Sequence, residues 1–140
     1  MPRRTPTLAE YRTLAELRRA MRRFLAFSHE AAVAAGLPPR QHQALLSIKG
    51  WPEPDGITIS GLADHLALKH HSAVGLVDRL VRRGLVRRRV SRRDRRRVEL
   101  ELTRQGEALI ARLSVAHLDE LARTGPELRR ILGMLPGRDD

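Results

Sequence analysis

The sequence predicts a mainly helical fold with one small β-hairpin. Over most of the chain, apolar residues recur at steps of three and four, which is the spacing of an amphipathic helix. Over residues 86–102 the spacing changes to two, which indicates two strands joined by a short polar turn. The 140 residues are enough for a single domain with a substantial core.

The first predicted helix covers residues 5–36. Thr5 is a suitable N-cap, Pro6 suits the first helical position, and Gly36 is a typical helix stop. The apolar stripe of this helix consists of Leu8, Tyr11, Leu14, Leu17, Met21 and Phe24. Arginines fill much of the opposite side, so the helix has an apolar face and a cationic face.

A second helix is predicted over residues 39–49, directly after a Leu-Pro-Pro turn. Residues 50–56 are a loop by their proline and glycine content. We expect Trp51 to anchor this loop on the core rather than to contact a ligand. Residues 57–59 are a candidate for a very short strand.

Two further helices are predicted in the middle of the chain. Ser60 is expected to cap a short one over residues 60–67, and a longer one is expected over residues 70–83, ended by Gly84. The hairpin follows. Residues 37–103 therefore combine a helix-turn-helix with a basic hairpin, which is the winged helix-turn-helix arrangement.

The C-terminal part is predicted as two helices. Thr103 is expected to cap the first, which runs to about residue 123. Gly125 and Pro126 are expected to end it before a last helix over residues 127–135.

Residues 5–36 and 104–135 thus flank the winged part as helical segments. Their apolar stripes exceed what one small domain covers, so we expect two copies of the chain to pair through them. Such a dimer would present two winged parts with twofold symmetry. The alternative is that these segments fold back onto their own subunit.

The positive charge is concentrated in one stretch. The formal net charge is +11, and residues 82–97 hold ten arginines and one acid, Asp94, which gives 10 − 1 = +9. A charge run is usually a solvated face, but charges this dense repel within a Debye length of about 8 Å unless a polyanion relieves them. The charge therefore indicates a polyanionic partner, either a nucleic acid or an acidic membrane surface.

Composition and motifs argue against several classes of protein. Without cysteine the chain has no disulfide, no cysteine-ligated zinc and no thiol switch. It has no apolar run of about 18 residues that would span a membrane and no secretory signal, so we expect it in the cytoplasm. No catalytic or nucleotide-binding motif is present, so we expect no enzyme activity and no cofactor, and the histidine spacings do not support a metal site.

The helix over residues 70–83 is the candidate recognition helix, because the second helix of such a pair lies in the major groove of double-stranded DNA. Its candidate contacts are Lys69, His70, His71, Ser72, Gly75 and Arg79. Their ammonium, imidazole, hydroxyl and guanidinium groups can donate to bases or phosphates, and the glycine permits close approach. The alternative is that they are solvated residues at a helix start.

The hairpin is a narrow cationic finger that fits the minor groove, where negative potential is strongest over A·T-rich sequence. Its candidate contacts are Arg88, Arg92, Arg93, Asp94, Arg95 and Arg96. We expect Asp94 to orient one or two arginines rather than to cancel their field. A solvated charged face is the alternative.

Five stretches of the chain form a pattern that spans most of its length. They are LPPRQHQALL at 37–46, ISGLA at 59–63, VDRLVRRGLVRR at 77–88, DRRRV at 94–98 and LTRQG at 102–106. In order and spacing they resemble the MarR family of bacterial regulators. The most specific part is Asp-x-Arg followed by Leu-Thr-x-x-Gly.

The resemblance implies a winged helix dimer whose first and last helices interlock. It implies that Arg96 enters the minor groove with Asp94 bracing it, and that residues 69–83 read the major groove. Family members usually repress promoters, and many release DNA when a small aromatic compound binds between the dimer helices and the DNA-binding part. In this chain that crevice would involve Phe24, Phe27, His42 and Leu46.

The sequence also departs from the family pattern. Some relatives sense oxidants through a cysteine, which this chain lacks. Many carry a polar or cationic residue where Gly75 stands, so base contacts would depend more on His70, His71 and Ser72.

The favoured hypothesis is a sequence-specific DNA-binding homodimer that regulates transcription. One alternative is a nonspecific nucleic-acid binder. The other is an interaction or enzyme module whose basic hairpin meets an acidic protein.

Overall fold

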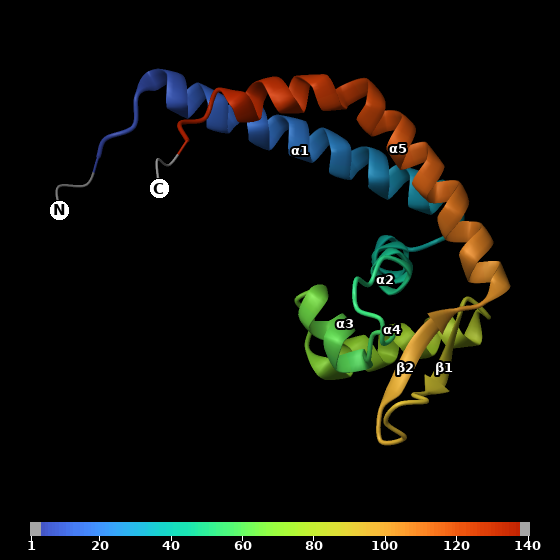
Figure 1. The fold of residues 1–140 in the computed structure, drawn as a ribbon. Coiled ribbons are helices and arrows are strands. Elements are labelled where there is room, and N and C mark those ends of the chain that lie inside the picture. Colours follow the sequence, from blue (N-terminus) through green and yellow to red (C-terminus); the bar gives the residue numbers. More distant parts are fainter. Residues whose placement is uncertain (1–3, 138–140) are drawn as a thin grey trace. The chain divides into compact units, whose positions relative to one another are not determined.

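The computed structural model describes residues 4–137 and confirms a mainly helical fold with one hairpin (Figure 1). The elements in chain order are α1 (Leu8–Ala34), α2 (Pro39–Lys49), α3 (Ile59–His65), α4 (His70–Arg82), β1 (Val86–Val90), β2 (Val98–Leu102) and α5 (Arg104–Gly133). They form two compact units. The first holds the chain up to Ala31 and from Val115 onward, and the second holds Ala32–Ser114.

Helix α1 begins two residues later than the sequence predicts. Thr7 caps it in place of Thr5: the Thr7 Oγ1 accepts the Glu10 N–H at 3.2 Å, and the Glu10 carboxylate accepts the Thr7 N–H at 2.8 Å. This reciprocal capping box needs a carboxylate three residues after the cap, and only Thr7 has one. The hydrogen bond from the Thr7 N–H, helped by Arg4, lowers the pKa of Glu10.

Gly36 ends α1 as predicted. Its φ of +73° is the left-handed conformation that favours glycine. The Leu37 N–H then bonds the Ala32 carbonyl at 2.9 Å, and the Gly36 N–H bonds the Val33 carbonyl at 2.9 Å. This Schellman arrangement satisfies the last carbonyls of the helix.

In the first unit, α1 and α5 run side by side in opposite directions (Figure 1). His117 bonds Ser28 at 2.8 Å near one end, and Arg130 pairs with Glu16 at 3.6 Å near the other. Large apolar side chains nevertheless stay exposed on both helices, and they include Leu8, Tyr11, Leu14, Met21, Leu25, Val115, Leu118 and Leu132. One copy of this unit therefore leaves much apolar surface in contact with water.

Helix α5 is continuous, so the predicted break at Gly125 and Pro126 is wrong. A proline inside a helix removes its own N–H bond, and its ring also clashes with the Cβ of the preceding residue. Here the preceding residue is Gly125, which has no Cβ. In addition, the Thr124 hydroxyl bonds the Glu120 carbonyl at 2.9 Å in the turn before the proline.

The second unit gathers α2, α3, α4 and the hairpin around one core (Figure 1). Helix α2 has the predicted bounds, and Ala44, Leu45 and Ile48 on its inner face are buried. The rest of this core includes Leu37, Ile57, Leu62, Ala73, Val77, Leu80, Leu85, Val86 and Leu100. These side chains hold α4 and the hairpin in a fixed relation within the unit.

Residues 57–59 do not form the predicted strand. Ile59 already belongs to α3, and the cap of that helix is Thr58 rather than Ser60, because the Thr58 Oγ1 accepts the Gly61 N–H at 3.1 Å. The Ile57 carbonyl accepts a single backbone bond from Leu100 of β2 at 2.8 Å. One such bond attaches the loop to the hairpin without extending the sheet.

Thr58→Ala is expected to lower the free energy of unfolding by about 1 kcal/mol, because the Gly61 N–H loses its acceptor. Ser60→Ala removes a hydroxyl two residues away that caps nothing, and it should leave stability nearly unchanged. Urea unfolding of both variants measures the difference. A larger loss for Ser60→Ala would show that the cap is misplaced.

The two strands pair in antiparallel register from Val86↔Leu102 to Val90↔Val98. Thr103 caps α5 as predicted, since its Oγ1 accepts the Gly106 N–H at 3.1 Å. The same hydroxyl donates to the Gly84 carbonyl, and the Thr103 N–H bonds the Leu85 carbonyl at 3.0 Å. The start of α5 is thus tied to the chain between α4 and β1.

Candidate nucleic-acid interface

The six candidate recognition residues lie at the start and along the solvent side of α4. Lys69 is the N-cap residue and uses its side chain for no capping bond. Lys69, His70, His71 and Arg79 are exposed, and Ser72 and Gly75 are half-buried. The opposite side of the helix, formed by Ala73, Leu76, Val77 and Leu80, is buried in the core. The unit therefore presents the polar side of α4 outward on a rigid base.

The strands of the hairpin carry arginines that are matched by acids. Arg87 pairs with Glu101, and Arg88 of β1 pairs with Asp78 of α4. The Arg89 guanidinium lies 3.2 Å from the Glu101 carboxylate. Both acids lie outside residues 82–97, the stretch that gave a net charge of +9, and Asp78 lies on the neighbouring helix. The strands are consequently much closer to neutral than the sequence count suggests.

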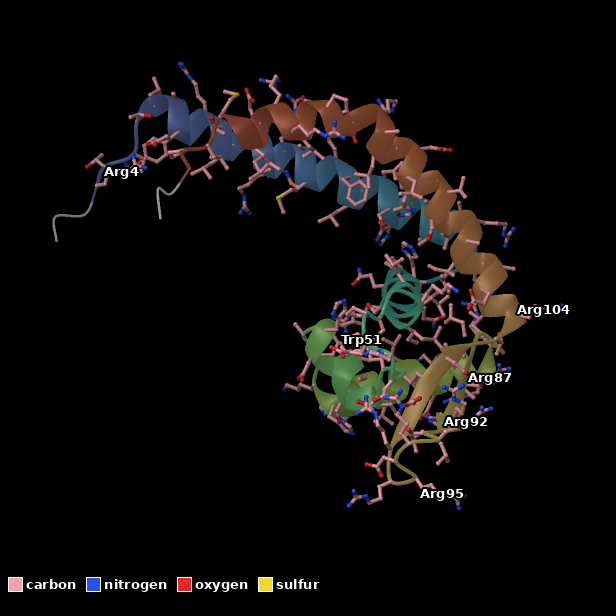
Figure 2. The ribbon with its side chains drawn as sticks, viewed as in Figure 1. Arg4, Trp51, Arg87, Arg92, Arg95 and Arg104 are labelled. Atoms are coloured by element: carbon pink, nitrogen blue, oxygen red, sulfur yellow. The ribbon has the colours of Figure 1, made fainter. Side chains whose placement is uncertain are left out.

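The turn between the strands, residues 91–97, carries the exposed positive charge, and we call it the wing tip. Figure 2 shows Arg95 at the far end of this turn and Arg92 nearer the strands. Neither has an ion-pair partner among the described residues. Arg93 lies 3.7 Å from the Asp55 carboxylate, which is a loose contact.

Arg96 and Asp94 form the expected pair at the wing tip. The Asp94 carboxylate accepts the Arg96 backbone N–H at 3.0 Å and its Nε at 3.2 Å. The Arg96 side chain is nevertheless 92% exposed. Asp94 therefore orients this guanidinium while leaving most of it open to a ligand.

Ser91 fixes the shape of the wing tip, and sequence reasoning gave it no role. It is buried, and its hydroxyl accepts the backbone N–H groups of Arg93 and Asp94 at 3.2 and 3.3 Å. The turn closes with bonds from the Ser91 N–H to the Arg97 carbonyl and from the Arg97 N–H to the Asp94 carbonyl, both 2.9 Å. A serine placed before a polar turn is the signal that could have identified it.

Glu99 is a buried carboxylate in β2, only 3% exposed, although the alternating pattern predicts that it faces water. Its neighbour Val98, predicted to face inward, is 42% exposed. Burial alone would raise the pKa of Glu99. Hydrogen bonds from the Arg89 guanidinium, the Gly56 N–H and the Ser91 hydroxyl outweigh burial and lower that pKa below the usual 4.5.

The loop before α3 packs against Glu99 and contacts the wing tip at Arg97. The Arg97 guanidinium donates to the Gly56 carbonyl at 3.1 Å. Because Gly56 lacks a side chain, its backbone comes close to Glu99: a Cβ there would lie 3.0 Å from the Glu99 Cβ. In the same loop, Trp51 packs edge-on against His65 of α3, with ring centroids 5.9 Å apart.

Glu99→Gln is expected to reduce the loss of stability in acid. Since the folded pKa of Glu99 lies below its unfolded value of about 4.5, the ionised carboxylate contributes stability above that pH, and this is lost as pH falls through the folded pKa. Between about pH 7 and pH 3, wild-type protein should therefore lose more free energy of unfolding than Glu99→Gln. Urea unfolding across this range tests it, with exposed Glu53→Gln as the control. Equal pH dependence in Glu99→Gln and wild type would contradict the assignment.

The four candidate ligand residues do not line one cavity within either unit. Phe24 and Phe27 line a cavity of about 490 Å³ in the first unit, together with Arg23 and Arg123 among others. Both rings also meet the His117 ring edge-on, at centroid distances of 6.0 and 5.5 Å.

The other two candidates lie in the second unit, where His42 is buried and Leu46 is exposed on α2. Among residues 4–137, no three histidine or acidic side chains are placed to hold a metal ion. No helix in the described part of the chain is long and apolar enough to cross a membrane.

Comparison with known proteins yields one family match. Residues 35–97 match the family model described as MarR family. This segment contains α2, α3, α4, β1 and the whole wing tip. Curated proteins give no match.

Solved structures resemble the chain over most of its length. CouR from Rhodococcus jostii, bound to p-coumaroyl-CoA, is 25% identical with a TM-score of 0.66 over 89% of this chain and 92% of that one. A MarR family protein from Bacillus stearothermophilus is 25% identical, with a TM-score of 0.67 over 81% and 80%. A complex of S. aureus MepR with DNA is 22% identical, with a TM-score of 0.62 over 76% and 78%.

Proposed function

We propose, from the match of residues 35–97 to the MarR family model, that the protein is a transcriptional regulator that binds double-stranded DNA in a sequence-specific manner. The observation that carries the proposal is the pairing of two surfaces on one rigid unit. The polar side of α4 is exposed, and the wing tip next to it carries exposed arginines, of which Arg92 and Arg95 form no ion pair within residues 4–137. The solved MepR complex with DNA is a structural relative.

In this proposal α4 enters the major groove, where Lys69, His70, His71 and Ser72 contact base edges or phosphates. Gly75 lets the helix approach closely. The wing tip follows the backbone into the adjacent minor groove, where the narrow shape of A·T-rich sequence attracts arginine. Arg96 is the inserting side chain, and the remaining wing arginines contact phosphates.

We propose that residues 5–36 and 104–135 join two chains into a homodimer and that residues 37–103 form its DNA-binding lobe. The apolar side chains exposed on α1 and α5 support this, because a second copy would remove them from water. Twofold symmetry places two recognition helices on a palindromic operator. A dimer of this type acts on chromosomal DNA, so we place it in the cytoplasm.

We further propose that the protein is a repressor released by a small aromatic ligand. The support is the cavity that Phe24 and Phe27 line, because two aromatic rings in its wall suit an aromatic ligand. CouR, a structural relative, binds an aromatic acyl-CoA. This role involves no catalysis and no resident cofactor.

The experiment is equilibrium binding to the DNA upstream of the protein's own gene and to a scrambled duplex, over a salt series. We expect a preference of about 10³-fold or more for one duplex, with affinity that falls steeply as salt rises. If both duplexes bind equally, selection from a random-sequence library follows. No enrichment of any sequence would reject the regulator and leave a nonspecific nucleic-acid binder.

A further inference from the structure

A groove runs along α4 on the side that faces the first turn of α2. Its volume is about 590 Å³. Helix α2 contributes Arg40 and Gln41 to its lining, and α4 contributes His71, Gly75 and Arg79. A Cβ on Gly75 would lie 3.6 Å from the Arg79 Nη1, so this arginine lies directly over the glycine. The groove is thus formed where α4 lacks a side chain.

The groove is cationic. None of the residues that line it is acidic. Arg40 and Arg79 are both exposed, and neither forms an ion pair with another residue of the range 4–137. By contrast, Arg88 of β1, which lies toward the other side of α4, pairs with Asp78. Two guanidinium groups without counter-charge are an arrangement that suits an anion.

Arg40 does not serve the stability of its own helix. It stands in the first turn of α2, where a positive side chain opposes the helix dipole by about 0.3–1 kcal/mol. That turn has no acidic residue to offset it. Arg83 is different, because it bonds the Gln41 side chain at 2.9 Å and the Gly36 carbonyl at 3.0 Å and so holds the unit together. An unfavourable local placement such as that of Arg40 points to a function.

The position of the groove identifies the anion. A helix in the major groove has a line of phosphates along each edge, about 12 Å apart. The wing lies toward one side of α4, as the contact between Asp78 and Arg88 shows. We propose that the groove on the other side binds a backbone phosphate of the DNA, held by the guanidinium groups of Arg40 and Arg79. This inference rests on the proposed function, because it requires α4 in the major groove.

Binding of Arg40→Ala to a mixed-sequence duplex over a salt series tests the proposal, because a phosphate contact does not depend on base sequence. We expect affinity to fall roughly tenfold at about 0.1 M salt, and the slope of log K against log salt to become less steep by about 0.9 for each copy of the groove in use. A duplex selected from a random library should lose affinity by the same factor, so that specificity is unchanged.

Arg112→Ala is the matched control, since Arg112 is an exposed arginine of α5 in the same unit. A second measurement replaces single phosphates of the selected duplex with uncharged methylphosphonates. At one position in each half-site, wild-type protein should lose clearly more affinity than Arg40→Ala, in which only Arg79 remains to contact that phosphate. Unchanged affinity and slope in Arg40→Ala, or an altered base preference, overturns the inference and leaves the proposed function intact. If wild-type protein binds no duplex, both the phosphate-site inference and the proposed function are rejected.

Discussion

Arg96→Ala is expected to weaken binding to operator DNA by about 1–3 kcal/mol for each wing in contact, which is roughly 5- to 150-fold. The guanidinium is 92% exposed and its ion pair is with Asp94 of the same turn. Its removal therefore takes away a DNA contact without opening the core. Because minor-groove arginine reads groove width, the loss should be larger on A·T-rich flanking sequence than on G·C-rich sequence.

Equilibrium binding at matched salt measures this effect, and urea unfolding of the same variant checks that stability is unchanged. Arg112→Ala again serves as the control for loss of one positive charge. Asp94→Asn should weaken binding less than Arg96→Ala, because it removes the carboxylate that orients Arg96 but keeps the Arg96 guanidinium. Unaltered affinity in Arg96→Ala would show that the wing tip does not bind DNA.

Gly106→Ala is expected to lower the free energy of unfolding by about 3 kcal/mol or more, a large part of the 5–15 kcal/mol typical of a domain. A Cβ at this position would lie 2.1 Å from the Leu85 carbonyl oxygen. Both atoms belong to fixed backbone, because the Leu85 carbonyl also accepts the Thr103 N–H at 3.0 Å. No side-chain rotation can relieve the overlap, so α5 would separate from the chain that leads into β1.

Gly75→Ala is the matched control, since it changes another helical glycine of the same unit. Its added Cβ meets only the end of the Arg79 side chain, at 3.6 Å. Helix propensity then predicts a gain of about 0.5–1 kcal/mol. Urea unfolding without DNA compares the two variants. Similar stabilities would mean that the junction at Gly106 relaxes easily.

The sequence predicts the type of nearly every element because hydrophobic spacing is a local property. The residue that caps a helix is harder to predict than the helix itself, because two side chains able to cap often lie two residues apart. Thr7 is distinguished from Thr5 only by Glu10, whose position three residues on completes the capping box. For α5, the rule that proline ends a helix overlooked Gly125, which removes the part of the clash that involves the preceding Cβ.

The density of arginines in the sequence located the candidate site, but it did not show which of those arginines are neutralised by acids. Asp78 and Glu101 neutralise strand arginines from which they are ten or more positions away, and only the fold brings them together. Glu99 is buried although the two-residue spacing alone would place it in water, because that spacing assumes that one face of a hairpin is solvent-exposed. Here the loop through Gly56 covers part of that face, and the covered carboxylate is matched by hydrogen bonds.

The proline inside α5 has a consequence for local opening of the protein. Without a proline N–H, the carbonyl of Ala122 has no bond partner along the helix, so the turns on either side of Pro126 are joined by one bond fewer. We therefore expect the residues after it, 127–133, to open together as one local unit, although Ile131 is buried and Arg130 pairs with Glu16. Their amide hydrogens should exchange with solvent faster than those of the preceding turns, and together rather than one by one.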